Sequence, residues 1–135
     1  MSKDCVFCRI ARNEELASFV YEDGSVIAFL DARPISEGHT LVVTRRHYEN
    51  IFAVPEDKLA YLFKIVKKVA LAVSNSEEAE GISLIQNNGS AAHQVVFHFH
   101  VHVIPRFVGR VSQMPRVAAE QTELDEVAAR IRKYI

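Results

Sequence analysis

Three histidines alternate with apolar residues in the segment 97–104, whose sequence is FHFHVHVI. Alternate side chains of a β-strand share one face, so a strand here places His98, His100 and His102 on the same side. The residues between them face the opposite way, into a core: Phe97, Phe99, Val101 and Val103. The pattern therefore predicts a strand with one apolar face and one face that carries three imidazoles.

Three imidazole rings on one face repel one another when protonated, which favours their neutral form near pH 7. A neutral imidazole can act as a nucleophile or as a metal ligand. The alternatives are three partly exposed histidines on a polar sheet face and a fortuitous metal site. We favour a chemical role, because chance rarely produces this alternation in a chain that has six histidines.

The two cysteines, Cys5 and Cys8, form a CxxC pair near the N-terminus. Two thiols supply half of a tetrahedral zinc site, and because the chain has no third cysteine, two histidines would have to complete it. The alternatives are thiols without metal and a thioredoxin-like redox motif, which is disfavoured because no strand precedes the pair. Two cysteines this close are also a poor disulfide framework, which indicates a reducing, cytoplasmic setting.

The elements that must position these residues can be predicted from periodicity and turn signals. Strands are expected at residues 19–22, 25–30, 39–44, 82–86 and 97–104. The first two are separated by Asp23-Gly24, a strong hairpin signal, and Pro105 is expected to stop the last.

Three helices are also expected. A short one spans residues 4–12, with Phe7, Ile10 and Ala11 facing inward. The longest follows Pro55, where apolar residues recur at helical spacing: Leu59, Leu62, Phe63, Val66, Val69, Ala70 and Val73. The last covers about 122–134, with Thr122 and Asp125 placed for a capping box. The order of elements predicts an α+β domain, with a mainly antiparallel five-stranded sheet, a long central helix and a C-terminal helix.

Composition and charge limit the classes of protein to which the chain can belong. The chain has 135 residues, of which 49% are hydrophobic and 24% charged, and this is typical of one globular domain covering residues 1–135. A formal net charge of -1 gives no broad electrostatic footprint for nucleic acid or an anionic membrane. No apolar stretch is long enough for a signal peptide core or a bilayer span.

The segment 98–104 resembles the motif of the histidine triad (HIT) family, His-φ-His-φ-His-φ-φ with φ apolar. The resemblance extends to Cys5-Val6-Phe7-Cys8, to Ala28-Phe29-Leu30-Asp31, to Gly38-His39-Thr40-Leu41-Val42-Val43, and to Asn87-Asn88-Gly89. It runs from about residue 5 to 106, with 107–135 as a tail and helix. The chain is most similar to the Hint-like branch with a bacterial-type zinc site, and less similar to the Fhit-like branch.

The resemblance implies a HIT-like fold and a hydrolase that acts on a phosphorus carrying a nucleoside. His100 would be the nucleophile that forms a nucleotidyl-histidine intermediate, His102 would bind phosphate oxygens, and His39 would support the site. The less favoured alternative is that His39 is a core histidine satisfied by backbone groups.

The resemblance also implies a purine nucleotide or an adenylated small molecule as ligand. Asp31 would accept hydrogen bonds from the ribose hydroxyls, Phe29 and Ala32 would line the base pocket, and Asn87 and Gln94 would contact the sugar and phosphate. Taken singly, such residues are more often turn or core residues.

Two positions depart from the family pattern. Many relatives place Gly where this chain has His93, and a hydroxyl or acidic residue where it has Val95. In the Hint-like branch that second side chain helps the leaving group depart, which valine cannot do. His93 could replace it as a hydrogen-bond donor or be an exposed loop residue.

By resemblance, one structural zinc per chain would be bound by Cys5, Cys8, His47 and His98, with no open position for catalysis. A homodimer is also implied. The expected activity is purine nucleoside phosphoramidase. The alternatives are a dinucleoside polyphosphate hydrolase, a less favoured nucleotidyl transferase, and a nucleotide-binding interaction module with little turnover. A purely zinc-binding structural module is the least favoured.

Overall fold

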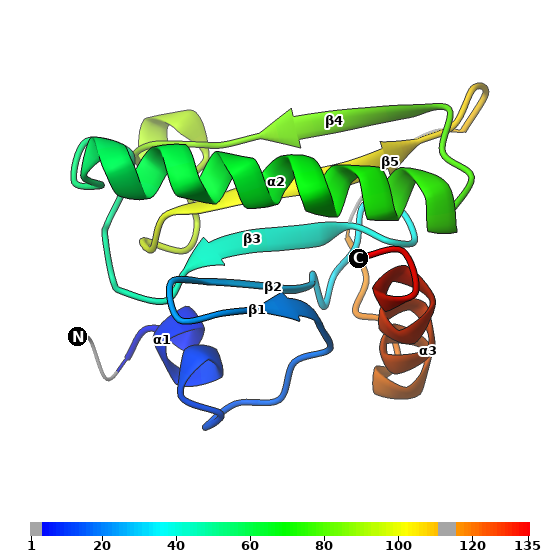
Figure 1. The fold of residues 1–135 in the computed structure, drawn as a ribbon, viewed down its shortest axis with the longest axis horizontal. Coiled ribbons are helices and arrows are strands. Elements are labelled where there is room, and N and C mark those ends of the chain that lie inside the picture. The colour runs from blue at the N-terminus through cyan, green and yellow to red at the C-terminus, as the bar shows by residue number, and fades with distance from the viewer. Residues whose placement is uncertain (1–3, 111–115) are drawn as a thin grey trace.

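The computed structural model describes residues 4–110 and 116–135. One five-stranded antiparallel sheet has the order β1-β2-β3-β5-β4, which confirms the α+β class (Figure 1). The strands are β1 (Phe19–Glu22), β2 (Val26–Leu30), β3 (Thr40–Thr44), β4 (Gly81–Ile85) and β5 (His100–Arg106).

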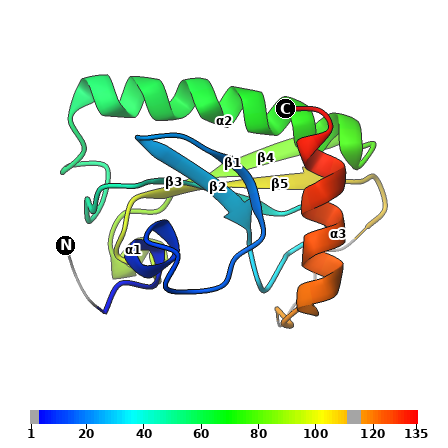
Figure 2. The same cartoon turned by 60° about the horizontal axis from the view of Figure 1, so that its bottom comes forward.

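The long helix α2 (Glu56–Ser76) covers one face of this sheet (Figure 2). Its inward side buries six residues, which are Leu62, Ile65, Val66, Val69, Ala72 and Val73. The expectation for Phe63 was wrong, because its side chain lies 40% exposed while Ile65 takes the inward place. No helix within the described ranges is both long and apolar enough to cross a membrane.

The other face of the sheet carries the short helix α1 (Val6–Ala11) at one end. Phe7 and Ile10 of this helix pack against Ile27, Phe29 and Leu41 in a second, smaller apolar cluster. This cluster leaves part of the face uncovered, which makes room for a cavity beside the histidines of β5.

The C-terminal helix α3 (Gln121–Arg132) packs beside β1 and α2. Its apolar spacing predicts one inward side, and four of the five residues on that side are buried: Leu124, Val127, Ala128 and Ile131. The fifth, Ile135, was wrongly expected there, because it lies beyond the end of the helix and is 38% exposed. The expected capping box is absent from it. The helix begins at Gln121 with no side-chain cap, and the Asp125 carboxylate instead accepts hydrogen bonds from Ser18 (2.6 Å) and Gln121 (2.9 Å).

The last strand differs from its predicted bounds at both ends. β5 begins at His100 because β3 ends at Thr44, and the backbone N–H of Phe99 donates to the Tyr48 carbonyl instead of extending the ladder. β5 continues through Pro105, which pairs with β4 after the register with β3 has ended. Proline is tolerated there because its side of the strand needs no ladder hydrogen bond.

Candidate functional site

The alternation predicted for the histidine strand holds within β5. Val101 and Val103 enter the core under α2, whereas His100 and His102 lie on the opposite face. A cavity of about 810 Å³ opens on that face. Its lining includes nine of the site residues expected from the sequence: Phe29, Asp31, Ala32, Asn87, His93, Gln94, Val95, His100 and His102.

The ring of His100 is held by the backbone. Its Nδ1 lies 2.6 Å from the carbonyl oxygen of His98. Because a carbonyl can only accept, Nδ1 carries the proton and Nε2 keeps its lone pair. Burial lowers the pKa of His100, so the ring is neutral near pH 7. A neutral imidazole with one nitrogen tied down and the other unprotonated can act as a nucleophile.

His39 lies behind the cavity, fully buried, and its tautomer is also fixed. The backbone N–H of Ile35 donates to its Nδ1 at 3.0 Å. The neutral ring therefore carries its proton on Nε2, which lies 2.9 Å from Nδ1 of His102. Burial lowers the pKa of His39 to about 3 and that of His102 to about 4. His102 accordingly accepts at Nδ1 and keeps a proton on Nε2 as a donor.

The turn before β3 places His39 at this position. Gly38 has a φ of +99°, a conformation that favours glycine. A Cβ on Gly38 would also lie 2.8 Å from Cγ of Glu77, the residue that follows α2. Glycine at this position therefore lets the chain pass close to α2 and direct the next residue toward β5.

The Asp31 carboxylate is bonded at both oxygens. Oδ1 accepts from the backbone N–H of Arg33 at 2.9 Å, and Oδ2 accepts from the Arg116 guanidinium at 2.5 Å. Arg116 also donates from Nε to the Arg33 carbonyl at 2.7 Å. The sequence analysis did not identify Arg116, because it lies in the tail and no motif marks it.

Apolar groups form the inner part of the cavity. The ring of Phe29 is buried and stands edge-on to Phe7 at 5.5 Å between centroids. Ala32 lies at the exposed rim, where its carbonyl accepts from the backbone N–H of Ala119 at 2.9 Å. Asn87, just after β4, is half-buried on another wall. An apolar floor with polar groups at its edges suits a base and a sugar.

The loop before β5 carries the next expected residue, Gln94. Gln94 is buried, donates to the Glu49 and Val96 carbonyls at 2.7 and 3.1 Å, and accepts from Gly89 at 2.7 Å. This arrangement supports a loop-holding role, and the expected substrate contact of Gln94 stays a prediction.

His93 and Val95 are the two departures from the family pattern. His93 has a φ of +68°, which explains why glycine suits this position. The side chain of Val95 is 84% exposed and lies at the rim of the cavity. Both positions are therefore open to a group that enters or leaves the site.

Four metal-ligating side chains meet beside β5: Cys5, Cys8, His47 and His98. The sulfur-to-nitrogen distances are 3.2, 3.4 and 3.6 Å, and the two histidine Nδ1 atoms are 3.2 Å apart. Tetrahedral zinc with its usual bond lengths requires about 3.3 Å between two nitrogen ligands and about 3.6 Å between a nitrogen and a sulfur ligand. His98 donates from Nε2 to the Thr44 carbonyl at 2.6 Å, which leaves the lone pair of Nδ1 directed at this cluster. The donor set and its spacing fit zinc.

Asp31, His39 and His102 form a second group of ligand atoms within 4.8 Å of one another. A metal here would need the lone pair of His39 Nε2. That nitrogen carries the proton, because Nδ1 accepts from Ile35, and Arg116 already provides a positive charge to Asp31. The second group is therefore a hydrogen-bonded chain, not a metal site.

Known proteins share both the sequence pattern and the fold of this chain. Residues 12–109 match the model of the HIT domain family. An adenosine 5'-monophosphoramidase of Candida albicans is 35% identical over 91% of this chain and 84% of its own. A hypothetical histidine triad nucleotide-binding protein of Sulfolobus tokodaii is 41% identical, with a TM-score of 0.91 over 96% of this chain and 91% of that one. A zinc-bound histidine triad protein of Mycobacterium smegmatis is 32% identical, with a TM-score of 0.87 over 97% and 92%.

Proposed function

Since the chain belongs to the HIT family, we propose that it is a nucleotide hydrolase in which His100 attacks a phosphorus that carries a nucleoside. The observation that carries this proposal is the bond from His100 Nδ1 to the His98 carbonyl. It leaves Nε2 unprotonated on a ring that lines the cavity.

The reaction proceeds in two displacements. Nε2 of His100 forms a bond to phosphorus while the bond from phosphorus to the leaving group breaks, and that group takes a proton from solvent as it departs. Water then attacks the same phosphorus and gives a proton to solvent, while the bond from phosphorus to Nε2 breaks. This step releases the nucleotide and returns His100 to its neutral form. The Nε2–H of His102, fixed by His39, donates to a phosphoryl oxygen whose negative charge grows in each transition state.

Nucleoside phosphoramidates are the proposed substrate class, and the phosphoramidase of Candida albicans supports it. Dinucleoside polyphosphates are the second candidate, favoured by Val95. Its apolar side chain at the rim cannot protonate a departing amine, whereas a departing phosphate needs less such help.

We further propose that Cys5, Cys8, His47 and His98 bind one structural zinc ion. When bound, zinc would crosslink the N-terminal segment to His98, two residues before the start of β5. A site with four protein ligands leaves no coordination position open for catalysis. The zinc-bound relative of Mycobacterium smegmatis supports this assignment.

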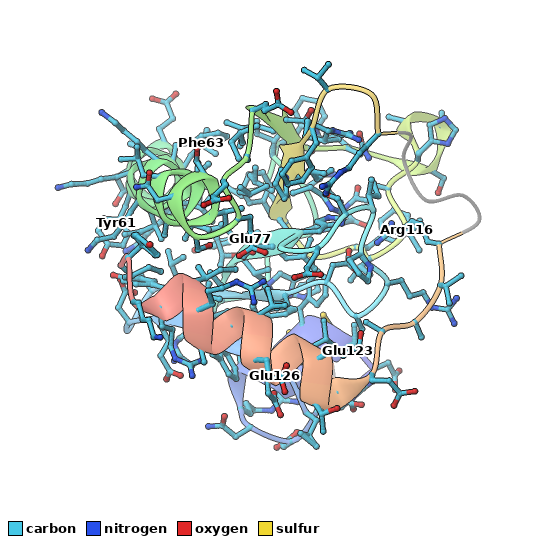
Figure 3. The ribbon with its side chains drawn as sticks, turned by 90° about the vertical axis from the view of Figure 1, so that its right-hand side faces the viewer. Tyr61, Phe63, Glu77, Arg116, Glu123 and Glu126 are labelled. Carbon is cyan, nitrogen blue, oxygen red and sulfur yellow. The ribbon has the colours of Figure 1, made fainter. Side chains whose placement is uncertain are left out.

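A homodimer is proposed as well. The edge strand β4 exposes half of Leu84, and the neighbouring helix α2 exposes Leu71. Phe63 of α2, labelled in Figure 3, is exposed as well. These apolar side chains offer a surface that a second copy would cover. Sedimentation velocity at micromolar concentration should give the mass of two chains, and a Leu84→Glu variant should give the mass of one.

The test of the main proposal is a substrate panel on purified protein. Wild type should release AMP from adenosine phosphoramidates, and His100→Ala should lose turnover by at least a thousandfold while AMP still binds. Mass spectrometry after acid-free quenching should find adenylate on His100. In His102→Ala turnover should fall, yet the label should still form on His100. Near-normal turnover in His100→Ala would exclude this mechanism.

A further inference from the structure

Arg116 connects the C-terminal tail to the cavity. It precedes α3, lines the cavity wall, and is labelled in Figure 3. Its guanidinium donates to the Asp31 carboxylate at 2.5 Å and to the Arg33 carbonyl at 2.7 Å. A backbone bond from Ala119 to Ala32 holds the same stretch of tail in place. The stretch of tail from Arg116 to Ala119 is thus held at three points on the loop that carries Asp31, and Arg116 makes two of these bonds.

The carboxylate that Arg116 contacts needs a countercharge. The Asp31 side chain is only 13% exposed, and a shielded carboxylate without a cationic partner is costly. Nε2 of His39 also lies near this carboxylate, 3.5 Å from Oδ2. His39 is neutral, so it provides no charge. Among the described residues that line the cavity, the cation bonded to this carboxylate is Arg116.

The same geometry sets up a competition for one proton. The Nε2–H of His39 lies 2.9 Å from His102 Nδ1 and 3.5 Å from Asp31 Oδ2. Either acceptor would take this hydrogen bond if the other were absent. Arg116 satisfies Asp31 Oδ2 and so leaves the proton of His39 to His102.

We propose that Arg116 is the permanent counter-ion of Asp31 and, through it, a positioning residue that keeps the His39 proton on His102. This inference rests on the proposed function, because it assigns a task to His102 in the same site. Without Arg116, Asp31 would draw the His39 Nε2–H toward itself. Nδ1 of His102 would then lose its donor, and its proton could move between the two ring nitrogens.

The charged groups near these two rings shift their pKa values in opposite directions. His39 is surrounded by Asp31, His102, Arg116 and Arg106, and His102 by His100, Asp31 and Arg116. Asp31 favours protonation of both rings, while Arg116 opposes it. Removal of Arg116 leaves the influence of Asp31 less opposed, so both pKa values should rise.

The direct test is nitrogen NMR of the histidine rings at pH 7, in the metal-loaded full chain without substrate. In wild type, His102 should be protonated on Nε2 alone. In Arg116→Gln it should become a mixture of both tautomers, and its pKa should rise by about one unit. Arg116→Lys, which keeps the charge, should hold the pKa near the wild-type value. Arg12→Gln, which removes an equal charge from the exposed pair with Glu14, is the matched control and should change neither.

A second measurement separates this inference from the proposed function. Arg116→Gln should lower kcat for an adenosine phosphoramidate by about tenfold, with a smaller change in KM, and should move the acid limb of the pH profile upward. If wild type neither binds nor hydrolyses nucleotides, the proposed function fails, while the NMR comparison still decides the role of Arg116. If the tautomer and the pKa of His102 are unchanged in folded Arg116→Gln, Arg116 only holds the tail in place. If that variant binds AMP more tightly than wild type, Arg116 competes with the ribose for Asp31. Either result overturns the proposal.

Discussion

His39 and His102 lie 63 residues apart in the chain, yet their Nε2 and Nδ1 atoms are 2.9 Å apart. The register of β3 on β5, which pairs Leu41 with His102 and Thr40 with Val103, brings them together. Because Ile35 fixes the proton of His39, the direction of this hydrogen bond is set by the backbone. His39 can therefore orient His102 without touching a substrate.

The first prediction concerns His39. His39→Ala should lower kcat by tenfold to a hundredfold, which is about 1.4–2.7 kcal/mol of transition-state stabilisation, because His102 loses its fixed tautomer. His39→Gln should retain more activity, since its amide can accept from Ile35 and donate to His102. Steady-state kinetics and AMP affinity would be measured for both. Equal losses in the two variants would show that His39 serves packing alone.

The second prediction concerns the ribose. If Asp31 accepts both ribose hydroxyls, Asp31→Ala should weaken AMP binding by about 1.5–3 kcal/mol, the range for hydrogen bonds to a charged group. Calorimetry with AMP and 2'-deoxy-AMP checks this, because the mutation should cost the deoxy ligand less. Asp31→Asn, which keeps the shape, should lie between wild type and Asp31→Ala. Equal losses for both ligands would mean that Asp31 only holds the loop and the tail.

The third prediction concerns zinc. Elemental analysis should find about one zinc per chain, and Cys8→Ala should lose the metal and part of its thermal stability. His93→Gly removes a histidine outside the cluster and should keep the zinc. The ligands must be thiolates and neutral imidazoles, so zinc should leave as the pH falls. A metal-free preparation whose stability is unaffected by chelators would contradict the assignment.

Local sequence patterns were sufficient to predict the order of the elements. Alternation marked the strands, helical spacing marked α2, and Asp23-Gly24 marked the first hairpin, because these signals need only nearby residues. The start of β5 could not be found in this way. Phe97 and Phe99 continue the alternation, but the end of β3 at Thr44 decides where pairing stops.

The site residues also divide into those that local sequence marks and those that only tertiary contacts bring into place. Resemblance to the HIT family pointed to the cavity residues and the metal-ligating cluster, since most of them lie in recognisable segments. Arg116 was missed because docking of the tail on Asp31 joins residues 85 positions apart and leaves no local signal. The capping box at Thr122 failed for a related reason, since Asp125 forms a tertiary hydrogen bond with Ser18.

The fourth prediction concerns pH. The pKa values of His39 and His102 are about 3 and about 4 in the folded protein, below the ordinary value of 6.5. The unfolded chain therefore binds protons first, so the stability linked to these rings is fully present above pH 6.5. It is lost as the pH falls toward 4, on the order of 1.4 kcal/mol per pH unit for each ring.

Urea unfolding between pH 7 and 4.5 measures this slope. His39→Gln removes one titrating ring and should flatten the curve by roughly half of that contribution. Loss of zinc would also lower stability as the pH falls, so Cys8→Ala and Cys8→Ala/His39→Gln should be compared in metal-free buffer. A wild-type free energy of unfolding that stays constant over this range would contradict neutral, buried histidines.

The last prediction concerns substrate choice and rests on Val95. The first displacement expels an amine, an alcohol or a phosphate, and its rate depends on how well the departing atom is protonated. The side chain of Val95 has no group that can donate a proton or a hydrogen bond, and it is exposed at the rim of the cavity. We therefore expect a narrower preference for phosphoramidates than Hint-like enzymes show, with measurable hydrolysis of dinucleoside polyphosphates.

Two variants separate Val95 from its neighbour His93. Val95→Ser introduces a hydroxyl, and it should raise the phosphoramidate-to-polyphosphate ratio of kcat/KM by about tenfold, or about 1.4 kcal/mol. His93→Gly suits the positive φ of that position and removes the rival donor, so it should leave the ratio unchanged. If Val95→Ser has no effect while His93→Gly lowers the ratio sharply, the loop histidine protonates the leaving group, and Val95 does not set the preference.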